Sequence, residues 1–278
     1  MVGGRPLGRH RRRHGQVRGT AGRRAPHGPP LRRGADRAQH AHDPRAARHR
    51  NRNFLGLPSH VVVPYDQNLA RFPAHLQQLD MESNGKGVTR DGDGIDTYDT
   101  GPAVWGEAGC NSQHSFFQLL HQGTTATPVD FLVAAGGHYG DGARHRMLVA
   151  SCLAQSRALM HGRTPHEARA DLERAGLDEQ TIARRLPHSV FPGNRPSNTL
   201  AYARLDPHTL GMLIAAYEHK VFVQVRSGAS TPSTSGGVEL GKQLTGPIAE
   251  TLAGDGDDPA TDASTAGLLR YLRGAQPD

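Results

Sequence analysis

Short apolar runs appear along the chain from residue 51 onward, and three of them predict strands. Val61–Val63 is a β-branched run, Asp130–Gly136 reads DFLVAAG, and Pro102–Gly109 reads PAVWGEAG. Apolar runs of this length, bounded by Gly, Pro and polar residues, are typical of buried strands. We therefore expect three strands that pack inside a folded core.

Longer segments between these runs predict helices. Gly142–Gly162 has the apolar spacing of an amphipathic helix. Thr164, Pro165 and Glu167 form a capping-box pattern with proline at the first helical position, which predicts a helix over Pro165–Ala175. Asp206-Pro207 opens a further helix through TLGMLIAAYEHK.

Three more local features complete this outline. The segment VFVQ, Val221–Gln224, predicts a strand directly after the TLGMLIAAYEHK helix, and DASTAGLLRYLRG predicts a short C-terminal helix. Asn111 is expected to cap a helix over SQHSFFQLLHQG. Strands that alternate with longer helices indicate an α/β fold with a mainly parallel sheet.

Residues 1–50 have a different composition from the rest of the chain. They hold 14 Arg, 2 Asp, 8 Gly and 5 Pro, a balance of +12, and they lack Ile, Phe, Trp and Tyr. The other 228 residues carry a balance of −5, so the net charge of +7 comes entirely from this segment. Without a period of 3.6 or 2 it cannot bury a face, and we expect it to be irregular or disordered.

Charge and composition also bear on the class of protein. An Arg-rich tail can bind nucleic acid through phosphates, and this reading stays as a lower-ranked alternative. No apolar run approaches the roughly 20 residues of a membrane helix, and we expect neither a membrane span nor a secretory signal. Irregular His spacing with no nearby Cys argues against a zinc site in the tail.

Generic motifs add little chemistry. DGDGID, Asp91–Asp96, differs from a calcium loop in the place of its glycine and in lacking a closing Glu, so a polar hairpin turn is favoured. The glycines after Gly136 do not have nucleotide-fingerprint spacing. Cys110 and Cys152 cannot form a disulfide framework, and we expect ordinary buried thiols.

Longer motifs carry a family resemblance. QQLDMESNGKGVTRDG (77–92), TGPAVWGEAGCNSQHSFFQLLHQGT (100–124), GNRPSNTL (193–200), TLGMLIAAYEHKVFVQ (209–224) and GVELGKQL (237–244) resemble the glucose-6-phosphate isomerase family. The likeness runs from Asn51 to the end except over Val225–Gly236. The family has two sugar-isomerase (SIS) α/β domains and a C-terminal arm in about twice this length, so the chain resembles its C-terminal half. The implied fold is an SIS-type three-layer sandwich with a helical C-terminal arm.

The resemblance implies roles for individual residues. Glu82 matches the catalytic base, His114 matches the ring-opening histidine supplied across a dimer interface, and Lys242 matches the lysine on the ring-oxygen side. Gln78 matches a substrate-contacting glutamine, and Arg5 matches the arginine that steadies the enediolate, although Pro6-Leu7 replaces the family's aromatic and Ser. Tyr217–Lys220 (YEHK) is interpreted as a helix end near the site.

The implied reaction converts glucose 6-phosphate and fructose 6-phosphate through a cis-enediolate. A single carboxylate can move the proton between C2 and C1, while separate acid and base groups open the ring. A fixed positive charge suits the enediolate. The resemblance implies no metal and no organic cofactor, a sugar phosphate substrate, a homodimer and a cytoplasmic location.

Two stretches resemble the family only when they are read in another frame. Shifting the codons of Ser227–Gly236 permits Trp-Gly-Ile-Asn-Ser-Phe-Asp-Gln-Trp, and the opposite shift over Val17–Arg50 permits the segment that precedes NRNFLG in the family. We hypothesise compensating insertions and deletions, from either a sequencing error or a decayed gene.

The predicted organisation therefore has four parts. Residues 1–50 are an out-of-frame Arg-rich segment, 51–224 are the second SIS-like domain, 225–236 are out of frame, and 237–278 are a helical region with the catalytic Lys. The chain as written is predicted to be inactive or poorly folded. The alternatives are a nucleic-acid-binding protein and a non-catalytic dimerisation partner of an intact isomerase.

Overall fold

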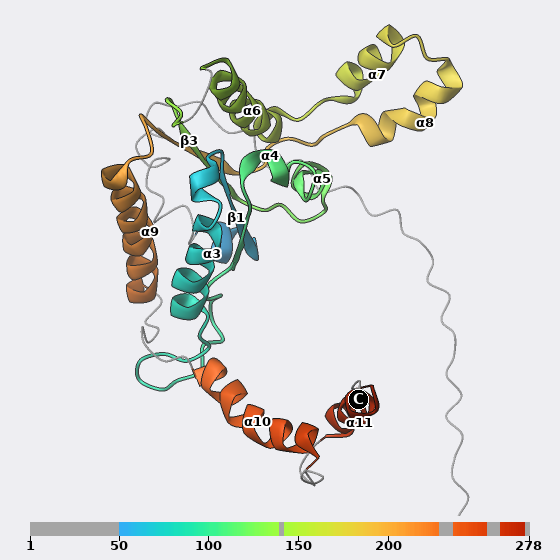
Figure 1. Ribbon diagram of the computed structural model, residues 1–278. Coiled ribbons are helices and arrows are strands. Elements are labelled where there is room, and N and C mark those ends of the chain that lie inside the picture. The colour runs from blue at the N-terminus through green and yellow to red at the C-terminus, as the bar shows by residue number, and fades with distance from the viewer. Residues whose placement is uncertain (1–49, 139–141, 228–235, 255–261, 276–278) are drawn as a thin grey trace, which may run out of the picture. The chain divides into compact units, whose positions relative to one another are not determined.

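A four-stranded parallel sheet forms the centre of the described fold (Figure 1). The computed structural model describes residues 50–138, 142–227, 236–254 and 262–275. The strand order is β2-β1-β3-β4, and every pairing between these strands is parallel. The strands are β1 (Ser59–Pro64), β2 (Ala103–Trp105), β3 (Val129–Ala134) and β4 (Ser197–Tyr202).

The two central strands are covered on both faces. Val61, Val63, Val129 and Phe131 have no exposed surface, and Val61 lies opposite Val129 in the β1–β3 register. Near-continuous apolar runs are typical of parallel strands because helices cover both sides of the sheet. The three strands predicted from the apolar runs are confirmed, as is the mainly parallel α/β fold.

Helices form one layer on each side of the sheet. Val61 and Val63 point into a core that includes Phe117, Leu120, Cys152 and Leu159, while the intervening Val62 joins a second core with Leu76, Leu213 and Tyr217. This alternation follows the period of two along a strand. The three-layer expectation is confirmed. One layer contains α5 (Phe117–Gln122) and α6 (Gly142–His161), and the other contains α3 (Phe72–Gln77) and α9 (Pro207–Ser227).

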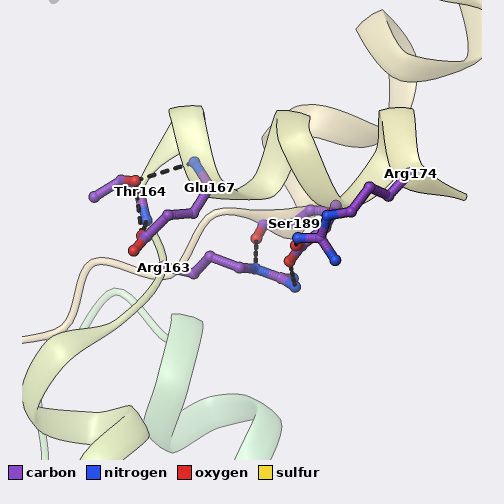
Figure 2. Close-up of polar contacts among 6 residues, drawn as sticks. Arg163, Thr164, Glu167, Arg174 and Ser189 are labelled. Atoms are coloured by element: carbon purple, nitrogen blue, oxygen red, sulfur yellow. Dashed lines mark hydrogen bonds and ion pairs between the residues drawn. The ribbon is translucent and has the colours of Figure 1, made fainter.

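Between α6 and β4 the chain forms a helical hairpin of α7 (Pro165–Arg174) and α8 (Glu179–Ser189). Figure 2 shows the predicted capping box at its start: Thr164 Oγ1 accepts from the Glu167 amide at 3.2 Å, and Glu167 Oε2 accepts from the Thr164 amide at 2.8 Å. The chain enters this hairpin at Arg163 and leaves it at Phe191, and these paired segments form its neck. Arg163 holds the neck together, because its Nε donates to the Ser189 carbonyl at 2.7 Å while Nη1 pairs with Asp171 at 3.3 Å. The capping box and the helix predicted after Thr164 are confirmed.

Helix α9 corrects two expectations. The segment Val221–Gln224 is helical rather than extended, and YEHK lies inside the helix rather than at its end. Leu213, Tyr217, Val221 and Val225 are buried at intervals of four, and Phe222 is exposed. The β-branched residues continue the buried stripe of the helix, and this packing outweighs their preference for strands.

The helix expected after Asn111 is divided in two. Ala108 caps α4 (Gly109–Ser112), so the prediction of Asn111 as the N-cap is wrong. A Cβ on Gly109 would lie 2.4 Å from the Tyr65 ring, so only glycine allows the helix to begin this close to β1. Gln113 then turns its side chain to the Tyr65 hydroxyl at 2.7 Å, and α5 begins only at Phe117.

Smaller elements complete the described chain. Val88 and Gly94 form an antiparallel bridge that encloses the first half of DGDGID, which confirms the hairpin turn. Cys152 is buried, but Cys110 is exposed, so the expectation of a buried thiol is wrong there.

The strand β4 and helix α8 were not predicted, because both have mixed polar patterns. The remaining elements are η1 (Arg50–Phe54), η2 (Gln67–Leu69), η3 (Gln78–Glu82), α10 (Gly236–Ala253) and α11 (Ala263–Gly274).

The C-terminal part is helical, and α11 confirms the predicted terminal helix. Residues 1–49, with Arg5 and most of the predicted Arg-rich segment, and residues 228–235 lie outside the described residues. Within the described ranges, no helix is both long and apolar enough to cross a lipid bilayer.

Candidate functional site

Gln78 and Glu82 occupy the two ends of one helical turn. The π-helical turn η3 continues α3, and the buried residues Phe72, Leu76 and Asp80 share the inner face of this combined helix. Gln78 and Glu82 are both exposed. Because four residues make nearly a full turn, both side chains lie on the same outer face and can reach one small molecule. Single π-turns occur frequently at functional sites.

Several contacts fix this turn beside strand β2. The Met81 sulfur accepts from the Val104 amide at 3.4 Å, and the Gly101 amide donates to the Asn84 carbonyl at 2.9 Å. Lys86 Nζ donates to the backbone carbonyls of Glu82 and Ser83. The backbone of Glu82 is therefore held at the sheet edge, and its carboxylate makes no hydrogen bond or ion pair with the residues that the structure describes.

His114 lies on the other side of β2 along the chain. It follows α4, its amide donates to the Asn111 carbonyl at 3.1 Å, and its side chain is exposed. Gly101 leads into β2 next to Asn84, whereas α4 begins after β2 has ended. Among the described residues, no hydrogen bond or ion pair links His114 to Gln78 or Glu82.

Lys242 lies on α10 and is strongly exposed. Its ammonium is 3.8 Å from Glu239 Oε2, one turn earlier on the same helix. Where side chains are described, Lys242 makes no ion pair or hydrogen bond with Gln78, Glu82 or His114. The structure thus brings together two of the five predicted site residues, places two others separately, and does not describe Arg5.

A buried polar cluster was missed by the sequence analysis. Asp130, in the middle of the sheet, accepts from His60 at 2.8 Å, Asn198 at 2.8 Å, Tyr217 at 3.0 Å and Lys220 at 3.3 Å. Two signals could have indicated it: an aspartate inside an apolar strand, and the Tyr and Lys of YEHK three residues apart on one helix face.

Electrostatics explain why Asp130 tolerates this position. Burial alone would raise the pKa of the Asp130 carboxyl, but the charges of Lys220 and His60 hold it well below its usual range. Burial, and then the charge of Asp130, raise the pKa of Tyr217 well above its usual value. The carboxylate stays ionised and the phenol protonated, so the cluster anchors α9 to the sheet.

The described side chains contain no group of three or more His, Cys, Asp or Glu arranged to hold a metal ion. Burial raises the pKa of the Cys152 thiol to about 12, which keeps it protonated and unreactive. The exposed pair of Gln78 and Glu82 is therefore the best candidate for chemistry in the described chain, with a hydrogen-bonding amide beside a carboxylate that can exchange protons.

Known proteins resemble this chain over most of its length. A glucose-6-phosphate isomerase of Xanthobacter autotrophicus is 54% identical over 223 residues, and one of Rhizobium meliloti is 52% identical over 223 residues. Each match covers 80% of this chain and 41% of the relative. The chain therefore spans about two fifths of the length of these curated relatives.

Solved structures give the same result for the fold. A glucose-6-phosphate isomerase from Chlamydia trachomatis superposes with a TM-score of 0.66 at 34% identity, covering 84% of this chain and 41% of that one. A hypothetical protein from Thermus thermophilus shares the fold, with a TM-score of 0.51 at 19% identity.

The parallel sheet with a helical layer on each side defines the class as a three-layer α/β protein. Within this class, the model of the phosphoglucose isomerase family matches residues 47–269. The chain belongs to the phosphoglucose isomerase family.

Proposed function

We propose that this chain is the C-terminal part of a cytoplasmic glucose-6-phosphate isomerase, which interconverts glucose 6-phosphate and fructose 6-phosphate in glycolysis and gluconeogenesis. The observation that carries the proposal is the pair of Gln78 and Glu82, exposed together on one turn at the sheet edge. This turn lies inside the segment that matches curated isomerases at 52–54% identity.

The chemistry assigns one task to each residue. Glu82 removes a proton from one carbon of the open sugar and returns it to the neighbouring carbon, and Gln78 contacts the substrate. His114 and Lys242 act in ring opening, and Arg5 stabilises the enediolate charge. The reaction needs no metal or organic cofactor.

A homodimer is part of the proposal. In one chain, Glu82 and the exposed His114 are separated along the sequence by β2, and no contact joins them in the described residues. The family resemblance, which implies that this histidine is supplied across a dimer interface, supports a site in which Glu82 meets the histidine of a second subunit.

We also propose that the chain as written does not turn over substrate. It spans about two fifths of its relatives, so residues that anchor the substrate phosphate are expected in the part that it does not cover. Binding energy at the phosphate positions the reacting carbons. The stretch 225–236 replaces expected apolar aromatics by Ser, Thr and Gly near Lys242.

A coupled assay for fructose 6-phosphate formation tests both statements. The purified chain is expected to show no turnover above that of its Glu82→Gln variant. A second preparation restores residues 17–50 and 227–236 to the alternative frames and adds the part of the Xanthobacter relative that this chain does not cover.

The completed preparation is expected to isomerise the sugar, and Glu82→Gln or His114→Ala is expected to abolish that turnover. Turnover that survives Glu82→Gln would contradict the assignment of the base. Glu82-dependent turnover by the chain alone would refute the prediction of inactivity.

A further inference from the structure

Asn84 makes a buried link between the Glu82 turn and helix α9. The residue is only 6% exposed, and its Nδ2 donates both to Asp80 Oδ1 at 2.8 Å and to Gln224 Oε1 at 3.2 Å. Asp80 lies inside η3, whereas Gln224 is 140 residues further along the chain, on α9. One amide group therefore spans the contact between the two elements.

The backbone around Asn84 is closed tightly as well. The Gly85 amide donates to the Met81 carbonyl at 2.9 Å, and a Cβ on Gly85 would lie 2.2 Å from that carbonyl oxygen. Lys86 Nζ donates to the backbone carbonyls of Glu82 and Ser83. Glu82 thus lies between Met81 and Ser83, whose backbone carbonyls both accept hydrogen bonds from the segment that follows Asn84.

We propose that Asn84 is a positioning residue for Glu82, which acts through Asp80 and Gln224 to hold the turn η3 against α9. Loss of the amide would leave two buried acceptors without this donor, a cost that opening of the turn to water would relieve. The proposal rests on the proposed function only in taking Glu82 as the catalytic base.

The link has a consequence for the end of α9. Gln224 immediately precedes the stretch 225–236, where the chain departs from the family pattern. Any change that unwinds the end of α9 would reach Glu82 through Gln224 and Asn84. The Glu82 turn is therefore coupled to the end of α9, which contributes no residue to η3.

Met81 provides a local spectroscopic probe. The chain has 5 methionines, so the spectrum of a sample labelled with ¹³C at the methionine methyl groups is simple, and the Met81 sulfur contacts the Val104 amide next to Glu82. The informative variants are Asn84→Ala and the size-conserving Gln224→Met. Gln113→Met is the control, because the Gln113 amide also donates to two separate segments, at the Tyr65 hydroxyl and Ser151 Oγ, but makes no contact with Asp130 or α9 in the described residues.

In the full chain, Asn84→Ala and Gln224→Met are each expected to shift or broaden the Met81 methyl signal and leave those of Met147 and Met160 in place. Hydrogen exchange of the Gly85 amide is expected to accelerate about tenfold or more, with exchange in β3 unchanged. The double variant is expected to change little beyond either single variant, because both remove one contact. Gln113→Met is expected to leave Met81 and Gly85 unchanged.

Three results would overturn the proposal: an unchanged Met81 signal in both variants, an equal rise of exchange throughout the fold, or an unprotected Gly85 amide in the unsubstituted chain. None of these measurements needs turnover. A completed preparation that lacks isomerase activity, together with the expected Met81 changes in the chain, would therefore count against the proposed function alone. Turnover by that preparation without the Met81 changes would count against the positioning role alone.

Discussion

Asp130 shows how a single buried charge organises this fold. It is 3% exposed at the centre of the sheet, and it accepts hydrogen bonds from residues on β1, β4 and α9. A charge in such a position is tolerated only when its hydrogen bonds and its countercharge are both present. The cluster therefore defines how α9 packs on the sheet, and with it the helix that reaches Asn84.

Lys220→Met is expected to destabilise the chain by about 3–5 kcal/mol, because it removes one partner of a buried ion pair and leaves the carboxylate uncompensated. Lys242→Met is the matched control on an exposed helix face, and a change within about 0.5 kcal/mol is expected there. Urea unfolding followed by circular dichroism measures both. Equal effects of the two substitutions would show that the buried pair contributes nothing specific.

The same cluster predicts a pH dependence. The pKa of Asp130 is held well below its usual range in the folded chain by Lys220 and His60, against the opposing effect of burial, and returns to about 3.9 on unfolding. The folded state therefore binds this proton more weakly. Its contribution to stability is complete above the unfolded pKa and is lost as the pH falls below about 4 towards the folded pKa.

The measurement compares unfolding free energies of the chain and of Asp130→Asn between pH 7 and pH 3. The difference between the two is expected to shrink as the solution becomes more acidic in the lower part of this range. Parallel curves throughout would mean that Asp130 does not carry the predicted linkage.

At the scale of elements, backbone pairing at the neck, between Arg163 and Phe191, holds the two ends of the α7–α8 hairpin together. Gly162 ends α6 with φ +66°, and a Cβ there would lie 2.2 Å from the Phe191 carbonyl oxygen. Arg163 and Phe191 exchange backbone hydrogen bonds beside it at 2.9 and 3.0 Å. Gly176 ends α7 with a similar φ of +71°, but nothing lies within 4 Å of its added Cβ.

These two glycines predict different costs for the same substitution. Gly176→Ala is expected to destabilise the chain by about 1–2 kcal/mol, from the left-handed backbone alone. Gly162→Ala adds a collision with the opposite backbone, for a further cost of about 1–3 kcal/mol. Denaturant unfolding of both variants checks this, and a Gly162→Ala variant no less stable than Gly176→Ala would contradict the described neck.

At the scale of the whole molecule, the chain spans about two fifths of the length of its curated relatives, and two of its stretches resemble the family only in another reading frame. Peptide mass spectrometry of the source cells distinguishes the explanations. If the alternative frame is the true one, a peptide reading Phe-Asp-Gln-Trp ahead of GVELGK is expected. Detection of the tryptic peptide SGASTPSTSGGVELGK, residues 227–242, would show that the written chain is made.

The sequence by itself predicted the parallel α/β fold, three of its strands and the capping box at Thr164. These features depend on local patterns: β-branched runs of strand length, and a Thr that is placed three residues before a Glu. The motif MESNGK likewise placed Glu82 within the family pattern without any knowledge of its surroundings.

Only the tertiary structure decided the remainder. VFVQ is helical because Val221 and Val225 continue a stripe that is buried against the sheet, and a local window cannot detect that partner. Asp130 and Lys220 are 90 residues apart in sequence, and Asn84 and Gln224 are 140 apart, so no spacing rule connects them. Local chemistry determines which elements form, whereas long-range burial determines which polar groups meet, because an unpaired polar group inside the core is too costly to keep.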